Sequence, residues 1–231
     1  MAEEKLTDQI YEKVAHRTTL TPLTEYEDLK TIVTPDGREV GRFRAFMGGK
    51  IEKFSIAEFS HAPSMNYTNA SLKPTARYNI PRFSFNYMEM KNKIQFDVDL
   101  YPAVDLAIRQ DYIDKYYEQL TNIYLQAKDA PYFTWRLSDR SWVRVSASPY
   151  FFMSSADITQ KDKVHNLLHA YLDVELKILA EEQEASDEEA ARIEYRINYF
   201  REILLEREPE RHMLEKAFGK ELTQRLGEAM T

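Results

Sequence analysis

Apolar and polar side chains alternate through residues 82–100, and the alternation is interrupted once, at Lys91-Asn92. A period of two places successive side chains on opposite faces of an extended strand, and a short polar interruption between two such runs is typical of a β-hairpin. The apolar side chains that would share one face are Phe83, Phe85, Tyr87, Ile94, Phe96, Val98 and Leu100. The other face carries an asparagine and two acids, which suit either a solvated sheet surface or the floor of a polar pocket.

The length of the hairpin loop decides which polar side chains face one another. A two-residue turn at Lys91-Asn92 would place Asn86 directly opposite Asp97, with about 5 Å between their Cβ atoms. A three-residue loop would move the pairing by one residue and send Asp97 to the opposite face. Because loop length is read poorly from a sequence, we favour the interpretation in which Asp97 and Asp99 are ordinary strand acids.

The segments before this hairpin carry further strand signals. Residues 4–16 have apolar side chains at helical spacing and predict a short amphipathic helix. Strands are predicted over residues 26–33, 38–47, 50–60 and 65–73. The turn signal Thr34-Pro35-Asp36-Gly37 joins the first two of these strands into a hairpin. With residues 82–100, the pattern predicts an antiparallel meander of about six strands.

Helical spacing dominates the second half of the chain. We expect a helix over residues 103–127 and helix from Lys161 to the end, while residues 141–147 alternate and predict one more strand. Breaks in the last helical region are expected near Ser186, Pro209 and Gly219. A run of strands followed by helices predicts an α/β protein in which helices cover a central antiparallel sheet. Because the chain shows no linker and no repeat, we predict one domain over residues 1–231.

Composition excludes several classes of function. Lys and Arg total 31 against 38 for Asp and Glu, a net charge of −7, which argues against a general nucleic-acid binder. The absence of cysteine excludes disulfides, thiolate catalysis and cysteine-held clusters. The N-terminal stretch MAEEKLTDQ resembles neither a signal peptide nor a transit peptide, and no run of about 18 apolar residues exists to span a membrane. We therefore expect a cytoplasmic protein.

Two clusters of polar residues have spacings that can form sites. His165 and His169 are four residues apart and would share one face of a helix, as a metal-binding pair requires. No third ligand is evident, so we favour an ordinary packed or solvated pair and assign no metal. The acidic run over residues 181–189 is most simply a solvated junction between helices, and Ser186 with Glu189 has the pattern of a helix N-terminal cap.

Four stretches resemble the ferredoxin-dependent bilin reductases. Residues 208–219 read EPERHMLEKAFG, similar to the family's C-terminal signature of an acidic residue before a short helix that ends in Phe-Gly or Tyr-Gly. Residues 69–74, 80–86 and 99–102 follow the order and spacing of the family's pocket strands. The match covers roughly 50 central residues and roughly 20 terminal ones, and its motifs are moderately specific.

The resemblance implies a three-layer α/β/α sandwich and the reduction of biliverdin or a related linear tetrapyrrole. It implies that reduced ferredoxin supplies the electrons, that no metal or flavin is bound, and that the protein supplies protons from a group whose pKa is near the working pH. On the family's pattern Glu208 falls at an acidic position in the last helical segment. Asn69 falls where members carry His or Asn. These two residues are therefore candidate catalytic residues.

Asn86 departs from the family's pattern. The family motif is Phe-Gly-x-Asp, and this chain reads Phe83-Ser84-Phe85-Asn86. An amide can hydrogen-bond a pyrrole nitrogen or a lactam oxygen, but it cannot give up and regain a proton as a carboxyl group does. Ser84 adds bulk where the backbone would approach a ligand. If the hairpin loop has two residues, Asp97 could replace the missing acid from the neighbouring strand.

The resemblance also implies charged partners. Lys128 and Arg211 are the expected partners of a bilin's two propionates, although both residues could equally be solvated surface charges. Ferredoxins are acidic, so a reductase needs a basic docking face despite the net charge of −7. The expected basic cluster consists of Arg38, Arg42, Arg44, Lys50 and Lys53, which strand alternation could divide between two faces.

Three hypotheses follow. The first is a reductase of the bilin reductase type that uses Glu208 as its main proton donor. The second is a protein on the same scaffold that holds a tetrapyrrole or another conjugated ligand without reducing it. The third, which has less support, is a structural protein with a closed pocket.

Overall fold

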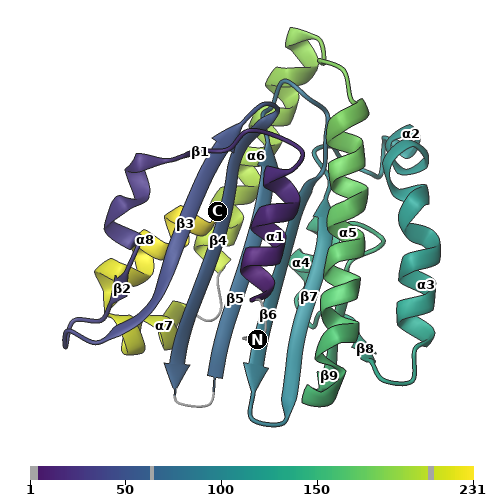
Figure 1. Cartoon of the computed structure of the whole chain (residues 1–231). Coiled ribbons are helices and arrows are strands. Elements are labelled where there is room, and N and C mark those ends of the chain that lie inside the picture. The colour runs from purple at the N-terminus through teal and green to yellow at the C-terminus, as the bar shows by residue number, and fades with distance from the viewer. Residues whose placement is uncertain (1–4, 63–64, 208–210) are drawn as a thin grey trace.

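The computed structural model describes residues 5–62, 65–207 and 211–231. In these ranges nine strands form one sheet in the order β1-β3-β4-β5-β6-β7-β9-β8, and β2 pairs with β3 off this path. Every strand pairing is antiparallel. Helices cover both faces of the sheet (Figure 1). The prediction of a three-layer α/β/α sandwich with a central antiparallel sheet is therefore confirmed.

The elements have the following bounds. The strands are β1 (Thr21–Pro22), β2 (Ile32–Val33), β3 (Glu39–Gly48), β4 (Ile51–Ala62), β5 (Met65–Pro74), β6 (Arg82–Met90), β7 (Lys93–Tyr101), β8 (Thr134–Arg136) and β9 (Phe152–Asp157). The α-helices are α1 (Leu6–Ala15), α2 (Gln110–Tyr112), α3 (Thr121–Asp129), α4 (Ser141–Ser146), α5 (Lys161–Glu181), α6 (Asp187–Arg207), α7 (Arg211–Phe218) and α8 (Lys220–Met230).

The five long strands from β3 to β7 form a meander in which each strand pairs with the next one along the chain. The hairpin expected over residues 82–100 is present, and its loop consists of Lys91 and Asn92. Because each strand alternates, the meander presents two chemically different faces. The breaks near Ser186 and Gly219 are also present, and Gly219 has a φ of 81°, which glycine adopts without strain. The break expected near Pro209 lies outside the described residues.

The larger hydrophobic core lies between one face of the sheet and helices α1 and α5, which cross the near face in Figure 1. The apolar side chains that share one face of the β6–β7 hairpin, Phe83, Phe85, Tyr87, Ile94, Phe96, Val98 and Leu100, all belong to this core. On the far face lie α6, α7 and α8. A smaller core, which includes Phe43, Ala57, Phe59, Phe218 and Leu226, joins β3 and β4 to α7 and α8. The described helices include none that is long and apolar enough to cross a membrane.

Three predicted elements were wrong or only partly right. Residues 26–33 were expected to form a strand, but a 3-10 helix (Thr24–Leu29) is followed by only two strand residues. The helix expected over residues 103–127 begins at Gln110 and passes through a π-helical turn (Ile113–Tyr117) and a 3-10 turn (Glu118–Leu120) before α3. Asp105 accounts for the late start, because its carboxylate accepts from the Ala107 N–H and its carbonyl oxygen from the Ile108 N–H, which forms a turn before the helix.

The strand expected at residues 141–147 is the short helix α4. Val143 and Val145 favour a strand locally, but tertiary contacts decide the conformation. The Arg144 guanidinium donates to the Ser138 carbonyl oxygen at 2.7 Å, and the Ser148 backbone N–H donates to Asp99 at 2.8 Å. The strand that does extend the sheet is β9 (Phe152–Asp157), which was not predicted.

Candidate ligand cavity

A cavity of about 350 Å³ lies between the far face of the sheet and helices α6, α7 and α8. This volume falls within the range of roughly 300–1,000 Å³ that is typical of small-molecule sites. Its polar floor includes Tyr67, Asn69, Arg82, Ser84, Asn86 and Tyr101. Its apolar cover includes Phe200, Leu204, Leu205, Leu214, Leu226 and Met230. The arrangement suits a flat ligand with an apolar body and a few polar atoms.

One row of polar side chains crosses the floor of the cavity. Asn69 of β5 pairs with Asn86 of β6, and Asn86 pairs with Asp97 of β7. Directly paired residues of an antiparallel sheet point to the same face. The two-residue loop therefore places Asp97 beside Asn86, which corrects our preference for treating Asp97 as an ordinary strand acid.

Asn86 lies at the centre of a hydrogen-bond network. Its Oδ1 accepts from the Tyr67 hydroxyl at 2.5 Å and from Asn69 Nδ2 at 3.1 Å, and its Nδ2 donates to Asp97 Oδ1 at 2.9 Å. Two donors on one side and a carboxylate on the other fix the orientation of the amide. Among the described residues the second N–H of Asn86 has no hydrogen-bond acceptor, so it suits a ligand atom.

Asn69 is buried and has an unpaired acceptor. Its Nδ2 donates to the Phe85 carbonyl oxygen at 2.8 Å as well as to Asn86. Its Oδ1 has no hydrogen-bond partner among the described residues. Buried polar atoms are normally paired, so this oxygen suits a ligand that brings an N–H group.

Asp99 and Tyr101 follow Asp97 on the same face of β7. Asp99 is fully buried, and both of its oxygens accept hydrogen bonds from Ser148, one from the backbone N–H and one from the hydroxyl. Burial raises the pKa of Asp99 to about 7, although the bonds from Ser148 oppose this shift. Burial, with the nearby charges of Asp97 and Asp99, also raises the pKa of the Tyr101 phenol well above its usual value. Asp99 pairs with Ser84, which lines the cavity.

Arg82 is the cation on the floor of the cavity, and it fastens the cover. Its guanidinium donates to the carbonyl oxygens of Met230 and Thr231 at 3.0 and 3.2 Å, and its Nε donates to the Ser71 hydroxyl. Lys53 Nζ donates to the Ala229 carbonyl oxygen at 2.9 Å. Cations at the C-terminal end of a helix satisfy its last carbonyls and oppose its dipole. Both cations therefore attach α8 to the sheet.

We expect the substitution Arg82→Gln to loosen α8, because charged hydrogen bonds each contribute about 1.5–3 kcal/mol. Amide hydrogen exchange in residues 220–230 should become faster by about tenfold or more, since tenfold corresponds to about 1.4 kcal/mol. Lys216→Gln, which removes an exposed cation from α7, serves as the control and should leave this exchange unchanged. Equal exchange rates in wild type and Arg82→Gln would show that Arg82 does not hold the cover.

The other predicted ligand contacts are placed as follows. Asn69, Asn86 and Ser84 line the cavity, and Asp97 bonds to Asn86. Lys128 lies elsewhere: it is exposed on α3, and its ammonium group is 4.8 Å from the centre of the Trp135 ring, so the propionate contact expected of it is not supported. Arg211 begins α7, and its side chain is not described. Glu208 lies outside the described residues.

The basic cluster expected on residues 38–53 does not exist as one surface. Arg42 and Arg44 pair with acids of β4 and α1, at Glu58 and Asp8. Lys50 Nζ instead donates to two carbonyl oxygens at the end of α5. Lys53 points to the opposite face, toward α8. Strand alternation and local pairing both divide the cluster.

The two histidines pack separately on α5. The His165 ring lies 5.5 Å from the Tyr87 ring, and burial lowers its pKa to about 4. His169 Nε2 is 3.2 Å from Gln9 Oε1. No group of three or more potential metal ligands of the His, Cys, Asp or Glu type occurs in the described part of the chain.

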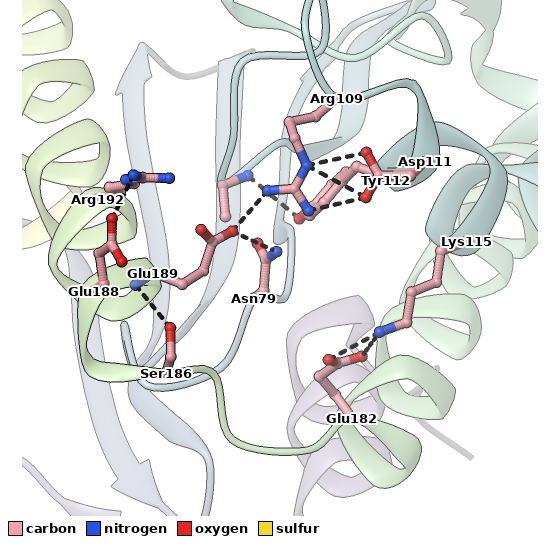
Figure 2. A network of polar contacts seen from close by, with 11 residues as sticks. Asn79, Arg109, Asp111, Tyr112, Lys115, Glu182, Ser186, Glu188, Glu189 and Arg192 are labelled. Atoms are coloured by element: carbon pink, nitrogen blue, oxygen red, sulfur yellow. Dashed lines mark hydrogen bonds and ion pairs between the residues drawn. The ribbon is translucent and has the colours of Figure 1, made fainter.

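The acidic run at residues 181–189 holds the start of α6 in place (Figure 2). Glu189 accepts from Arg109 at 2.7 Å and from Asn79 at 3.2 Å, and Glu182 pairs with Lys115. The Ser186 hydroxyl accepts from the Glu189 backbone N–H, which confirms the predicted cap. Only Ile193 of α6 is fully buried, so these polar contacts position a helix that forms much of the cavity cover. The acidic run therefore joins two helices and also forms ion pairs and hydrogen bonds that hold α6 in position.

Sequence reasoning missed three floor residues, Tyr67, Arg82 and Tyr101. The signal was present, because Arg82 precedes Ser84 and Asn86 by two and four residues, and Tyr101 follows Asp97 by four. Residues separated by an even number of positions share a face of a strand.

Comparisons with known proteins identify a matching family, two related sequences and a solved structure with the same fold. A sequence model of the family described as ferredoxin-dependent bilin reductase matches residues 7–229. The chain is 24% identical over 182 residues to the phycoerythrobilin:ferredoxin oxidoreductases of Prochlorococcus marinus strains MIT 9301 and MIT 9312, covering 75% of this chain and 70% of each relative. The crystal structure of phytochromobilin synthase from tomato in complex with biliverdin matches with a TM-score of 0.86 at 17% identity, covering 96% of this chain and 79% of that one. At this identity the structural match shows a shared fold.

Proposed function

Because the chain belongs to the ferredoxin-dependent bilin reductase family, we propose that it reduces biliverdin or a related linear tetrapyrrole with electrons from ferredoxin. Each reduction of one double bond takes two electrons, from two reduced ferredoxins, and two protons. The protein's part is to bind the bilin, to exclude water and to deliver the protons. The bilin would lie between the polar floor and the apolar cover of the cavity.

The observation that carries the proposal is the polar row on the cavity floor. A bilin offers pyrrole N–H donors and lactam oxygen acceptors along one flat, conjugated body. The unpaired Oδ1 of Asn69 suits an N–H donor, and the remaining N–H of Asn86 suits an oxygen or an unprotonated nitrogen. Phe200 and the leucines of the cover suit the apolar faces of the rings.

Proton delivery is assigned to carboxyl groups, because an amide does not exchange a proton in this way. We propose Glu208 as the main donor, on the resemblance of its position to the family's pattern. Asp97 is the proposed second source, since its Oδ1 lies 2.9 Å from Asn86 Nδ2, directly beside the floor. Asn86 and Asn69 would then orient the bilin for these donors.

Absorbance titration with biliverdin, followed by addition of a ferredoxin reducing system, tests this function. Wild type is expected to bind biliverdin and then bleach its long-wavelength absorbance. Glu208→Gln should retain binding and lose bleaching by about a hundredfold or more, because general acid catalysis contributes about 10²–10⁴. Glu206→Gln, an exposed acid at the end of α6, is the matched control and should behave as wild type. Bleaching at the wild-type rate by Glu208→Gln would remove Glu208 from this role.

A second candidate function is supported by Asn86 itself. The central position carries an amide whose oxygen is already saturated by Tyr67 and Asn69, and this arrangement holds a ligand without supplying a proton. On this reading the protein binds a tetrapyrrole or another conjugated ligand and leaves it unreduced. Tight binding of biliverdin without any turnover by a competent ferredoxin system would favour this second function over the reductase.

A further inference from the structure

A basic and apolar surface flanks the cavity at the edge of the sheet. It is formed by the end of β8 and by α4, and it consists of Arg136, Leu137, Arg140, Arg144 and Val145, called the arginine flank below. Residues 134–149 carry three arginines and one acid, Asp139, a net charge of +2 within a chain of −7. In the part of the chain that the structure describes, none of the three guanidinium groups forms an ion pair, and Arg136 and Arg144 are exposed.

Strand register places Arg136, the one strand residue of this flank, on the cavity side of the sheet. Arg136 pairs with Met153 of β9, and Met153 pairs with Asp97, which pairs with Asn86. Arg136 thus extends the row of Asn69, Asn86 and Asp97 to the edge strand. Three strand separations divide Arg136 from Asn86, a span of about 14 Å.

The segment that carries the flank also contacts β7 beside the cavity floor. Ser148, just after α4, bonds to both carboxylate oxygens of Asp99, and Asp99 pairs with Ser84 of the cavity lining. The buried contact between Ser148 and Asp99 therefore fixes the position of the flank relative to the cavity. A partner bound there would lie within a few strand widths of the bilin.

The exposed apolar residues of the flank indicate a protein partner. Leu137 is 62% exposed and Val145 is 82% exposed, and both lie within a few residues of the arginines. Arginine is enriched in protein–protein interfaces, and exposed aliphatic side chains beside the arginines would supply apolar contacts to a bound protein. Unpaired cations attract an acidic partner and speed its association.

We propose that the arginine flank is the docking surface for the ferredoxin that supplies the electrons. The proposal rests on the proposed function for the identity of the partner, and it assigns the surface independently of the cavity residues. Ferredoxins are acidic, so three guanidinium groups without an ion pair among the described residues complement them on a protein that is otherwise negative. The flank also replaces the cluster at residues 38–53, whose charges are engaged elsewhere.

Direct binding of a plant-type [2Fe–2S] ferredoxin to the full chain tests the surface without requiring turnover. The triple variant Arg136→Glu, Arg140→Glu, Arg144→Glu should lower the affinity at low ionic strength by about tenfold or more. The difference should shrink at roughly 0.5 M salt, where exposed charges are screened over a few ångströms. The affinity for biliverdin, measured by absorbance, should stay within about twofold of wild type, since the variant leaves the cavity lining unchanged.

The matched control reverses three exposed cations elsewhere, Arg17→Glu, Lys91→Glu and Lys93→Glu. It carries the same change in net charge and should bind ferredoxin within about threefold of wild type. The milder variant Arg136→Gln, Arg140→Gln, Arg144→Gln tests the flank if charge reversal disturbs folding. Equal losses in the flank and control variants would overturn the proposal, as would wild-type affinity in both flank variants. Loss of ferredoxin binding in the flank variant alone supports the surface even if biliverdin is never reduced, in which case the reductase function fails and the surface stands.

Discussion

Asn86→Asp is expected to raise the rate of ferredoxin-driven biliverdin reduction by about a hundredfold. Asn86 stands at the centre of the cavity floor, where its amide bonds to Tyr67, Asn69 and Asp97. A carboxyl group of nearly the same shape keeps the two acceptor contacts and adds a group that can deliver a proton. General acid catalysis by a positioned side chain contributes about 10²–10⁴.

The neighbouring Asp97 should tune the introduced carboxyl group. Two carboxyl groups within hydrogen-bond distance share one proton, and the pKa of one of them rises as a result. The shared proton would occupy the place where Asn86 Nδ2 now donates to Asp97 Oδ1. The gain in rate should therefore persist at neutral pH and fall as the pH rises and the pair loses its proton.

The double variant Asn86→Asp, Asp97→Asn separates this effect from a change in binding. In this variant the acid at position 86 has an uncharged amide at position 97 beside it, so no second carboxyl group raises its pKa. The gain in rate at neutral pH should therefore be smaller than in Asn86→Asp alone. The measurements are single-turnover bleaching rates with biliverdin in excess of its Kd, from about pH 6 to pH 9. An unchanged rate in Asn86→Asp, with biliverdin bound, would exclude position 86 from proton delivery.

Glu175→Met is expected to stabilise the protein, and the gain should grow with pH. Glu175 of α5 is fully buried, and neither carboxylate oxygen has a hydrogen-bond partner in the described residues. It lies near Tyr112 and Tyr117, whose phenol pKa values its charge raises further. Even a protonated carboxyl group costs about 1–3 kcal/mol when it is buried without a partner. Methionine has a similar shape, no polar atom to satisfy and adaptable packing.

The sign of the pH effect follows from the pKa of Glu175. Burial raises this pKa well above 4.5 in the folded protein, so the folded state keeps a proton that the unfolded state releases. Below pH 4.5 both states are protonated and the stability does not change with pH. Above it, wild type loses up to about 1.4 kcal/mol per pH unit until the folded pKa is reached. The variant has no such loss.

Urea unfolding of both proteins at about pH 5 and pH 8 measures the difference in the free energy of unfolding. The variant should be more stable by about 2 kcal/mol at the lower pH and by more at the higher pH. Glu181→Met, at the exposed end of the same helix, serves as the control and should change stability by less than about 0.5 kcal/mol. A gain that is equal at both pH values would show that Glu175 is not protonated in the folded protein.

Strict alternation made the central hairpin predictable, because one face of β6 and β7 is apolar and fully buried. The same reasoning failed for residues 141–147, where two valines suggested a strand and contacts to Ser138 and Asp99 stabilise a helix. It passed over β9, although Phe152 and Ala156 point to the core. The long helix after Pro102 was predicted in kind but not in its start or its π-helical turn, because helical spacing does not record such irregularities.

The cavity floor was predictable in part. The family's pattern pointed to Asn69, Ser84 and Asn86, which line one cavity. The face on which Asp97 lies depends on whether the hairpin loop has two or three residues. The sequence does not distinguish these two lengths, whereas the structure shows a two-residue loop. Lys128 was predicted from its charge alone. Charge does not show on which side of the sheet α3 packs, and Lys128 is not among the residues that line the cavity. Tyr67 and Arg82 needed the register of two strand pairs to be recognised.

The order of the elements has a consequence for how the protein folds. The meander from β3 to β7 spans residues 39–101 and joins neighbours along the chain, whereas α6 to α8 return over it from residues 187–230. Short loops close at a lower entropic cost than long ones, so we expect the meander to form before its helical cover. Asn69 and Asn86 would then stay hydrated until the last step, in which the helices close the cavity and exclude water from it. Substitutions on the cover should therefore change the unfolding rate, and leave the folding rate almost untouched.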